Sequence, residues 1–205
     1  LWAQVTGGKT KLKGISTGAQ DLDLDTDAYG LAVGGEAAVQ NITLGAAFMG
    51  GSGKTENDSV AGKDDFNYYG ISFYAKTQVQ GIDLEGDLSA AWLKSDLTVG
   101  GAADVDTDTT TAVYSLGIQA KKTFNLGVDV TPFIGMDVYH IKSDGFTTNH
   151  GVSIEDANAT IVEFPIGAEV KKAFQTASGF SVAPSFSLAV VPTVGSKDID
   201  SKVRF

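Results

Sequence analysis

An alternation of apolar and polar residues, with a period of two, constrains the fold of this chain more than any other feature. In the clearest segment, Leu84 and Leu88 fall on the opposite face to Glu85. Similar segments follow one another, whereas the three-and-four spacing of an amphipathic helix is almost absent. We count about nine such segments of roughly ten residues, the length that a tilted strand needs to cross a bilayer. The chain is therefore predicted to be all-β.

The connections between these segments alternate between short and long. Short joins are predicted at Gln40-Asn41, Gln80-Gly81, Asn125-Gly127 and Gln175-Gly179. Long polar excursions are predicted over 13–27, 51–67, 96–111 and 143–160. Short turns on one side and long loops on the other are typical of an up-and-down antiparallel barrel in an outer membrane.

Composition excludes several other classes. At 42% hydrophobic residues the chain is too apolar for disorder, and with no Cys it has neither disulfides nor thiolate metal sites. A formal net charge of -10 without a basic stripe argues against nucleic-acid binding. No run of about eighteen apolar residues encodes a transmembrane helix. No signal peptide is visible and the chain begins at Leu1, so we expect a processed or trimmed product.

Alternation alone does not separate a membrane barrel from a soluble barrel or sandwich, because either polarity produces it. The polar face is rich in small and charged residues, which would fill a dry core poorly and suit a wet lumen. Aromatic residues near the strand ends fit an interfacial girdle: Tyr29, Tyr69, Trp92, Tyr114 and Phe174. These features favour the membrane barrel over the soluble alternative.

In a membrane barrel the two faces have different surroundings, so each candidate residue is assigned by its parity. The residues predicted to face the lumen are Glu36, Lys76, Asp83, Glu85, Asp87, Gln119, Lys121, Asp129, Asp137, Glu163, Glu169 and Lys171. The residues predicted to form the lipid-facing belt are Leu31, Val33, Leu44, Phe73, Leu84, Leu88, Leu116, Ile134, Phe164 and Leu188.

Proline interrupts the predicted strands, because it lacks the N–H that a ladder requires. Pro132 and Pro184 are placed near strand starts. Pro165 and Pro192 fall deeper inside, so we expect bulges or unpaired positions there.

The sequence resembles the translocator domain of classical autotransporters (type V secretion) over nearly the whole chain. The similar pieces occur in the family's order: Leu1-Trp2-Ala3 with Gly7-Gly8, Tyr29-Gly30-Leu31, Leu44-Gly45-Ala46-Ala47, Tyr69-Gly70-Ile71-Ser72-Phe73-Tyr74-Ala75, Leu116-Gly117, Pro132-Phe133-Ile134-Gly135, Phe164-Pro165-Ile166-Gly167 and Ala183-Pro184-Ser185-Phe186.

The resemblance implies a barrel of about twelve strands with a helix threading its lumen, in the outer membrane of a Gram-negative bacterium. It also implies a barrel that anchors an N-terminal passenger and takes part in its secretion. The expected partners are this passenger, outer-membrane lipid and barrel-assembly machinery, with no nucleic acid. A free-standing small porin-like or structural barrel remains the alternative.

Residues 1–205 are expected to be one barrel domain that is incomplete at its C-terminus, with nine to ten of the strands. No pre-barrel helix precedes Leu1, and residues 195–202 leave too little chain for a full closing strand before Phe205. The strand Trp2 to Thr10 is therefore predicted to lack a second partner within the chain.

Several patterns suggest chemistry and have simpler interpretations. Gly51-Ser52-Gly53-Lys54-Thr55 resembles a phosphate-binding loop, but the required first glycine is Phe48 and no helix is expected to follow. His140 and His150 do not suggest a triad beyond chance. The alternating acids at 21–27 and 104–108 could align carboxylates for a hard cation, and a solvated acidic loop is the plainer interpretation.

Lumenal acids of some autotransporter barrels cut the passenger, so self-cleavage stays open beside a simple polar lining. No other enzymatic activity, no cofactor and no metal is predicted.

Overall fold

In the residues that the computed structural model describes, every element is a β-strand. The structure describes residues 1–16, 21–57, 62–99, 105–147, 153–175, 181–195 and 203–204. The longer strands are β1 (Trp2–Ser16), β2 (Asp21–Val39), β3 (Ile42–Asn57), β4 (Gly62–Val79), β5 (Ile82–Val99), β6 (Val105–Lys121), β8 (Asp129–Ser143), β11 (Ala157–Glu163), β12 (Ile166–Lys171) and β15 (Ser185–Val190). The shorter ones are β7 (Phe124–Asn125), β9 (Phe146–Thr147), β10 (Ser153–Ile154), β13 (Phe174–Gln175), β14 (Ser181–Val182), β16 (Thr193–Gly195) and β17 (Val203–Arg204). No helix in these ranges has the length and apolar character needed to cross a membrane.

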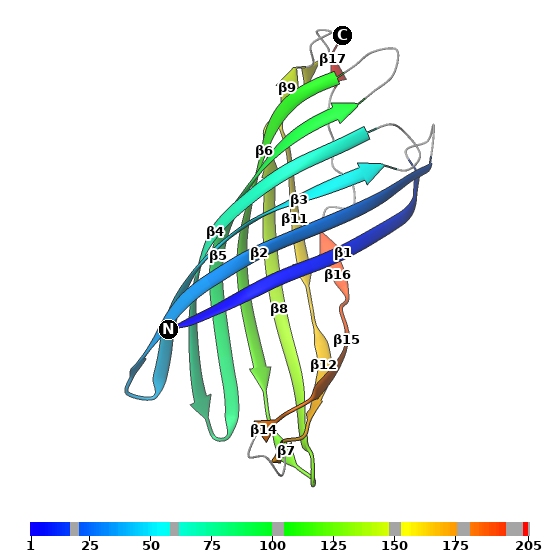
Figure 1. Cartoon of the computed structure of the whole chain (residues 1–205). Coiled ribbons are helices and arrows are strands. Elements are labelled where there is room, and N and C mark those ends of the chain that lie inside the picture. Colours follow the sequence, from blue (N-terminus) through cyan, green and yellow to red (C-terminus); the bar gives the residue numbers. More distant parts are fainter. Residues whose placement is uncertain are drawn as a thin grey trace.

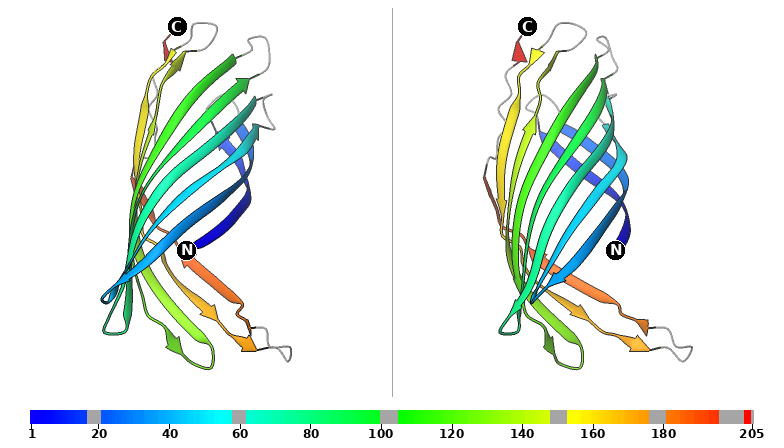
Figure 2. Two further views of the ribbon diagram at one scale, coloured as in Figure 1. Left: turned by 60° about the vertical axis from the view of Figure 1, so that its left-hand side comes forward. Right: turned by 90° about the vertical axis from the view of Figure 1, so that its left-hand side faces the viewer.

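Consecutive strands pair antiparallel, in the sheet order β1-β2-β3-β4-β5-β6-β8-β11-β16. The sheet curls around a central axis, and the strands are tilted relative to that axis (Figures 1 and 2). Within the described ranges β1 pairs with β2 alone, so the sheet is open at β1. The expectation that Trp2 to Thr10 lacks a second partner is confirmed for this part of the chain.

Tight turns join the strands at one rim. Gln80 and Gly81 both have positive φ, 51° and 76°, which fits a two-residue hairpin turn of type I′. Gln40 has φ 57°, and Gly127, with φ 83°, closes the turn after β7. The short joins predicted at these places are confirmed, and the fourth lies mostly outside the described residues.

The strands are longer than predicted, and this corrects the loop assignments. β2 has 19 residues and β4 has 18, and the pairing of β3 with β4 continues to the outer end, Asn57 opposite Gly62. Most of the residues assigned to long polar loops are therefore strand. The error arises because a ladder pairs backbone groups whatever the side chains are. Polar cross-strand pairs such as Thr26 with Thr55, at 3.0 Å between hydroxyl oxygens, line this part.

The prolines lie where their missing N–H costs least. Pro165 separates β11 from β12 and Pro192 separates β15 from β16, so both expected interruptions are confirmed. The carbonyl of Pro165 accepts a bond from the N–H of Gly135 at 2.8 Å, and that of Pro192 from Phe164 at 2.9 Å. The sheet thus continues through the interruptions.

Burial is inverted relative to a water-soluble protein. Among the described residues only Ala47 and Ala159 are buried apolar side chains, whereas Leu88 is 56% exposed. The side chain of Glu85, on the other face, is 30% exposed. Such a sheet has no apolar core of its own, which excludes the soluble sandwich.

The exposed belt predicts the effect of a charge placed on it. Leu88→Arg is expected to lower the free energy of unfolding in lipid by roughly 2–4 kcal/mol, the cost of arginine at mid-bilayer on a barrel's outer face. Gln119→Arg, on the opposite face beside Glu85, is the matched control and is expected to change stability little. Equal losses from the two variants, measured by urea titration in liposomes, would contradict the assignment of the faces.

Candidate functional site

The polar face of the sheet is the candidate site. Residues directly opposite in an antiparallel ladder share a face, and the register places Lys76 opposite Glu85 and Glu85 opposite Gln119. When this register is followed from strand to strand, all the residues predicted to face the lumen lie on this polar face. The residues predicted for the belt lie on the other face, and all are among the exposed large hydrophobic side chains.

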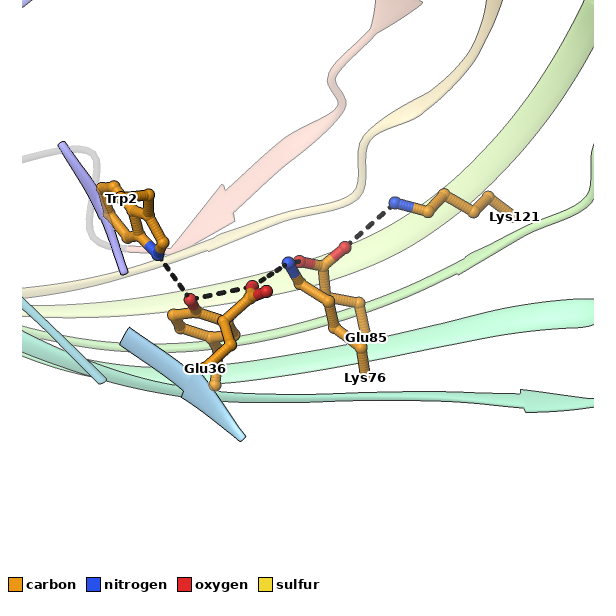
Figure 3. A network of polar contacts seen from close by, with 6 residues as sticks. Trp2, Glu36, Lys76, Glu85 and Lys121 are labelled. Atoms are coloured by element: carbon orange, nitrogen blue, oxygen red, sulfur yellow. Dashed lines mark hydrogen bonds and ion pairs between the residues drawn. The ribbon is translucent and has the colours of Figure 1, made fainter. Parts of the chain in front are cut away.

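A chain of polar contacts crosses this face from β1 to β6 (Figure 3). The Nε1–H of Trp2 donates to the hydroxyl of Tyr74 at 3.0 Å, and this hydroxyl donates to Glu36 Oε1 at 3.0 Å. Lys76 Nζ also donates to Glu36 Oε1, at 3.0 Å, and lies 3.9 Å from Glu85 Oε1. Lys121 Nζ donates to Glu85 Oε2 at 3.0 Å. Acid and base alternate along these four residues, so each charge of this network has an opposite neighbour.

Trp2 and Tyr74 were not among the residues predicted for the site. Their rings lie across glycines of the neighbouring strands: a Cβ on Gly45 would overlap with the ring of Tyr74, and one on Gly34 with that of Trp2. Aromatic rings packed over sheet glycines compensate for the missing side chain. The sequence pattern that marks such a pair is a glycine on the polar face of one strand opposite an aromatic residue of the next. The pattern can be recognised only when the register between the two strands is known.

A second group of acids lies further around the same face. Asp87, Gly117, Asp137 and Glu163 are successive partners across β5, β6, β8 and β11. A methyl group on Gly117 would collide with carboxylate oxygens of both Asp87 and Asp137, so the two carboxylates converge over this glycine. None of the ion pairs of the described residues involves these three acids. A paired and an unpaired region thus share one wall.

Comparison with known proteins decides the family. The family model described as "Autotransporter beta-domain" matches residues 1–205. The chain belongs to the autotransporter β-domain family. Its members are outer-membrane domains of Gram-negative bacteria, and this chain is a translocator barrel that anchors a passenger and takes part in its secretion.

Solved structures agree on the fold. The chain is similar to the β domain of the Bordetella autotransporter BrkA, with a TM-score of 0.68, 17% identity, and coverage of 98% of this chain and 81% of that one. It is also similar to the transport unit of the autotransporter AIDA-I from Escherichia coli, with a TM-score of 0.59, 14% identity, and coverage of 98% and 73%. No curated protein matches it.

The remaining predicted lumen residues of this autotransporter β-domain lie toward the tight-turn rim. Asp83 accepts a bond from Gln78 at 2.8 Å, and Asp129 accepts one from Asn125 at 3.0 Å. Lys171 is the ladder partner of Asp129. Asp83 is also the ladder partner of Lys121 and so adjoins the network around Glu85. The partners of Asp129, which are Asn125 and Lys171, do not belong to that network, and Glu169 is the ladder partner of Thr131.

The structure changes the interpretation of three other motifs. Residues 51–55 lie within β3, so they form neither a phosphate-binding loop nor the loop tip expected for them. Asp25 and Asp27 pair with Lys11 and Lys9, and the described residues contain no cluster of His, Cys, Asp and Glu suited to a metal ion. Asp104 and His150 lie outside the described residues. His140 contacts the hydroxyl of Thr160 at 3.1 Å.

Charged side chains continue beyond Tyr69 on β4, toward the rim opposite the tight turns. There the carboxylate of Glu56 raises the pKa of Lys54 by accepting its hydrogen bond. Partial burial raises the pKa of Asp64, and the neighbouring Asp65 and Asp96 add to the rise. Ser95 Oγ donates to Asp64 Oδ2 at 3.2 Å, which opposes the rise, and Oδ1 is buried without a hydrogen-bond partner.

This environment predicts a pH dependence of the β4–β5 hairpin. Because the folded pKa of Asp64 lies above the reference 3.8, the protonated acid favours the fold, and that contribution is lost as pH rises from 3.8 through the raised value. Hydrogen exchange of the hairpin amides, corrected for the intrinsic rate, should therefore accelerate over this interval. Asp64→Asn should abolish the acceleration and Asp65→Asn should keep it. An Asp64→Asn profile that follows the wild type at every pH would contradict this account.

Proposed function

We propose that the polar face forms the wall of the conduit through which the passenger crosses the outer membrane, while the apolar face meets lipid. The observation that carries this proposal is the inverted burial: large apolar side chains are exposed on one face, and charged side chains pair with one another on the other. Lipid is the solvent that stabilises exposed apolar side chains, and water is the solvent that hydrates charged side chains that are partly exposed.

A wall of paired charges suits the passage of a polypeptide. Glu36, Lys76, Glu85 and Lys121 neutralise each other, so a passing segment meets little net charge from these four residues. This part of the wall therefore has little net charge with which to hold the passenger.

We further propose that β1 closes the ring with strands outside residues 1–205, in a barrel of about twelve strands. An unpaired edge at membrane depth leaves N–H and C=O groups without partners, each at a cost of several kcal/mol. The match to 81% of the BrkA β domain supports this arrangement. Barrel-assembly machinery is the proposed partner of the β1 edge before closure.

A cross-linking experiment on the full-length protein tests the conduit. Residues 1–205 contain no cysteine, so a single cysteine introduced here is the only one among them. With a second cysteine in the passenger segment upstream of Leu1, Gln119→Cys should form a disulfide during secretion, because it lies on the proposed wall. Leu116→Cys, on the same strand but the opposite face, should not. Cross-linking at Leu116 in place of Gln119 would overturn the proposal.

Self-cleavage of the passenger is a second candidate function, favoured by the convergence of Asp87 and Asp137 over Gly117. Two carboxylates directed at one point can act as acid and base on a peptide bond held between them. Glu163, opposite Asp137, extends the acidic surface.

The double variant Asp87→Asn/Asp137→Asn separates the two functions. We expect the passenger to reach the cell surface as in the wild type, and its release into the medium to fall by about 100-fold or more, as when a general acid–base pair is removed. Asp83→Asn, whose carboxylate is held by Gln78, is the control and should release normally. Normal release from the double variant, measured by immunoblot of medium and cells, would exclude these acids as the cleavage site.

A further inference from the structure

We propose that the exposed face of the sheet carries a binding groove for one phospholipid, with an acyl chain lying along β6 and β8 and the headgroup phosphate at Lys122. The inference rests on the proposed orientation of this face toward lipid. It adds a ligand site to the apolar face, to which the secretion function assigns no ligand.

Small residues form the floor of the groove. Ala75 and Gly86 are ladder partners, and Ala120 lies one strand further on. They lie between larger apolar side chains, which leaves a hollow of about 600 Å³, within the range of sites that bind small molecules. The side chains that rise around the floor are Ile42, Leu84, Ile118, Ile134 and Met136.

The hollow continues toward the tight-turn rim. A second hollow of about 290 Å³ shares Ala120 and Ile134 with the first and extends to Lys122 and Pro132. Together they form one apolar track along β6 and β8 with a basic residue at its end. A fatty acyl chain has this elongated apolar form, and inside the bilayer its binding depends on van der Waals packing against the groove.

Lys122 supplies the charge complementarity. It is exposed, and its Nζ lies 5.5 Å from the centroid of the Phe124 ring, which is a cation–π distance. None of the ion pairs of the described residues involves Lys122. An ammonium group placed beside an apolar track at an interface is suited to a phosphate.

The position of the groove selects the lipid. Short turns of outer-membrane barrels lie on the periplasmic side, and Lys122 lies just before the turn closed by Gly127. The groove therefore opens to the periplasmic leaflet, where the acyl chains belong to phospholipids. The occupant is therefore a phospholipid, and neither a lipopolysaccharide nor a protein segment.

An internal repeat supplies a matched control. Lys172 lies over the ring of Phe174 at 5.4 Å, as Lys122 lies over Phe124. The N–H of Lys172 donates to the carbonyl of Pro184 at 3.2 Å, and that of Lys122 to Pro132 at the same distance. Lys172 lines neither of the two hollows, so it shares the interfacial chemistry of Lys122 without the groove.

Native mass spectrometry tests the site on the full-length protein, extracted from outer membranes in mild detergent. The wild type should retain one phospholipid. Gly86→Leu and Ala120→Leu fill the groove and should lower the retained fraction about tenfold, a loss of about 1.4 kcal/mol. A Cβ at Gly86 meets only ordinary contacts, at 3.6 and 3.9 Å, so the fold should tolerate the first of these variants. Lys122→Gln should lower retention several-fold.

Lys172→Gln and Ala90→Leu, the latter on the same face outside the groove, should retain the lipid as the wild type does. Absence of phospholipid from the wild type, equal loss in these controls, or lipopolysaccharide in its place would overturn the proposal. Passenger display in the same strains separates the lipid groove from the conduit proposal. Display of the passenger by a protein without bound lipid would refute the groove and leave the conduit proposal standing.

Discussion

At the depth of a bilayer's hydrocarbon, each backbone N–H and C=O without a partner costs several kcal/mol, and every other feature of this chain depends on meeting that demand. The antiparallel ladder meets it strand by strand, from β1 to β16. The prolines are tolerated on the same terms: at Pro165 and Pro192 the strand breaks, while the carbonyls still accept bonds across the sheet. Once the backbone is satisfied, side chains are sorted by face alone.

That sorting produces two surfaces with different physics. On one, apolar side chains stand exposed and gain nothing from each other, so their stability depends on lipid. On the other, charges pair across strands, and rings of Trp2 and Tyr74 cover glycines. The unpaired acids around Gly117 depart from this pattern. A cluster of like charges, on a face whose other charges are balanced, is typical of a functional site.

Much of the fold could be predicted from the sequence, because a period of two assigns every residue of a strand to a face. Leu88 and Glu85 were assigned from parity alone, and the proline interruptions followed from the missing N–H. Strand ends could not be predicted, since polar residues beyond the belt pair as well as apolar ones. The contact of Trp2 with Tyr74 and the groove at Gly86 could not be predicted either. Both depend on which residues become neighbours across strands, and that is set by register.

The central claim is that β5 presents alternate residues to lipid and to water. Site-directed spin labelling tests it most directly, because residues 1–205 contain no native cysteine and an introduced one is the only labelled site among them. Labels placed one at a time along 83–88 of the full-length protein in liposomes should alternate. We predict that labels at 84, 86 and 88 collide mainly with oxygen, and labels at 83, 85 and 87 mainly with a water-soluble nickel chelate. Collision rates without this period of two, or with its phase reversed, would contradict the account.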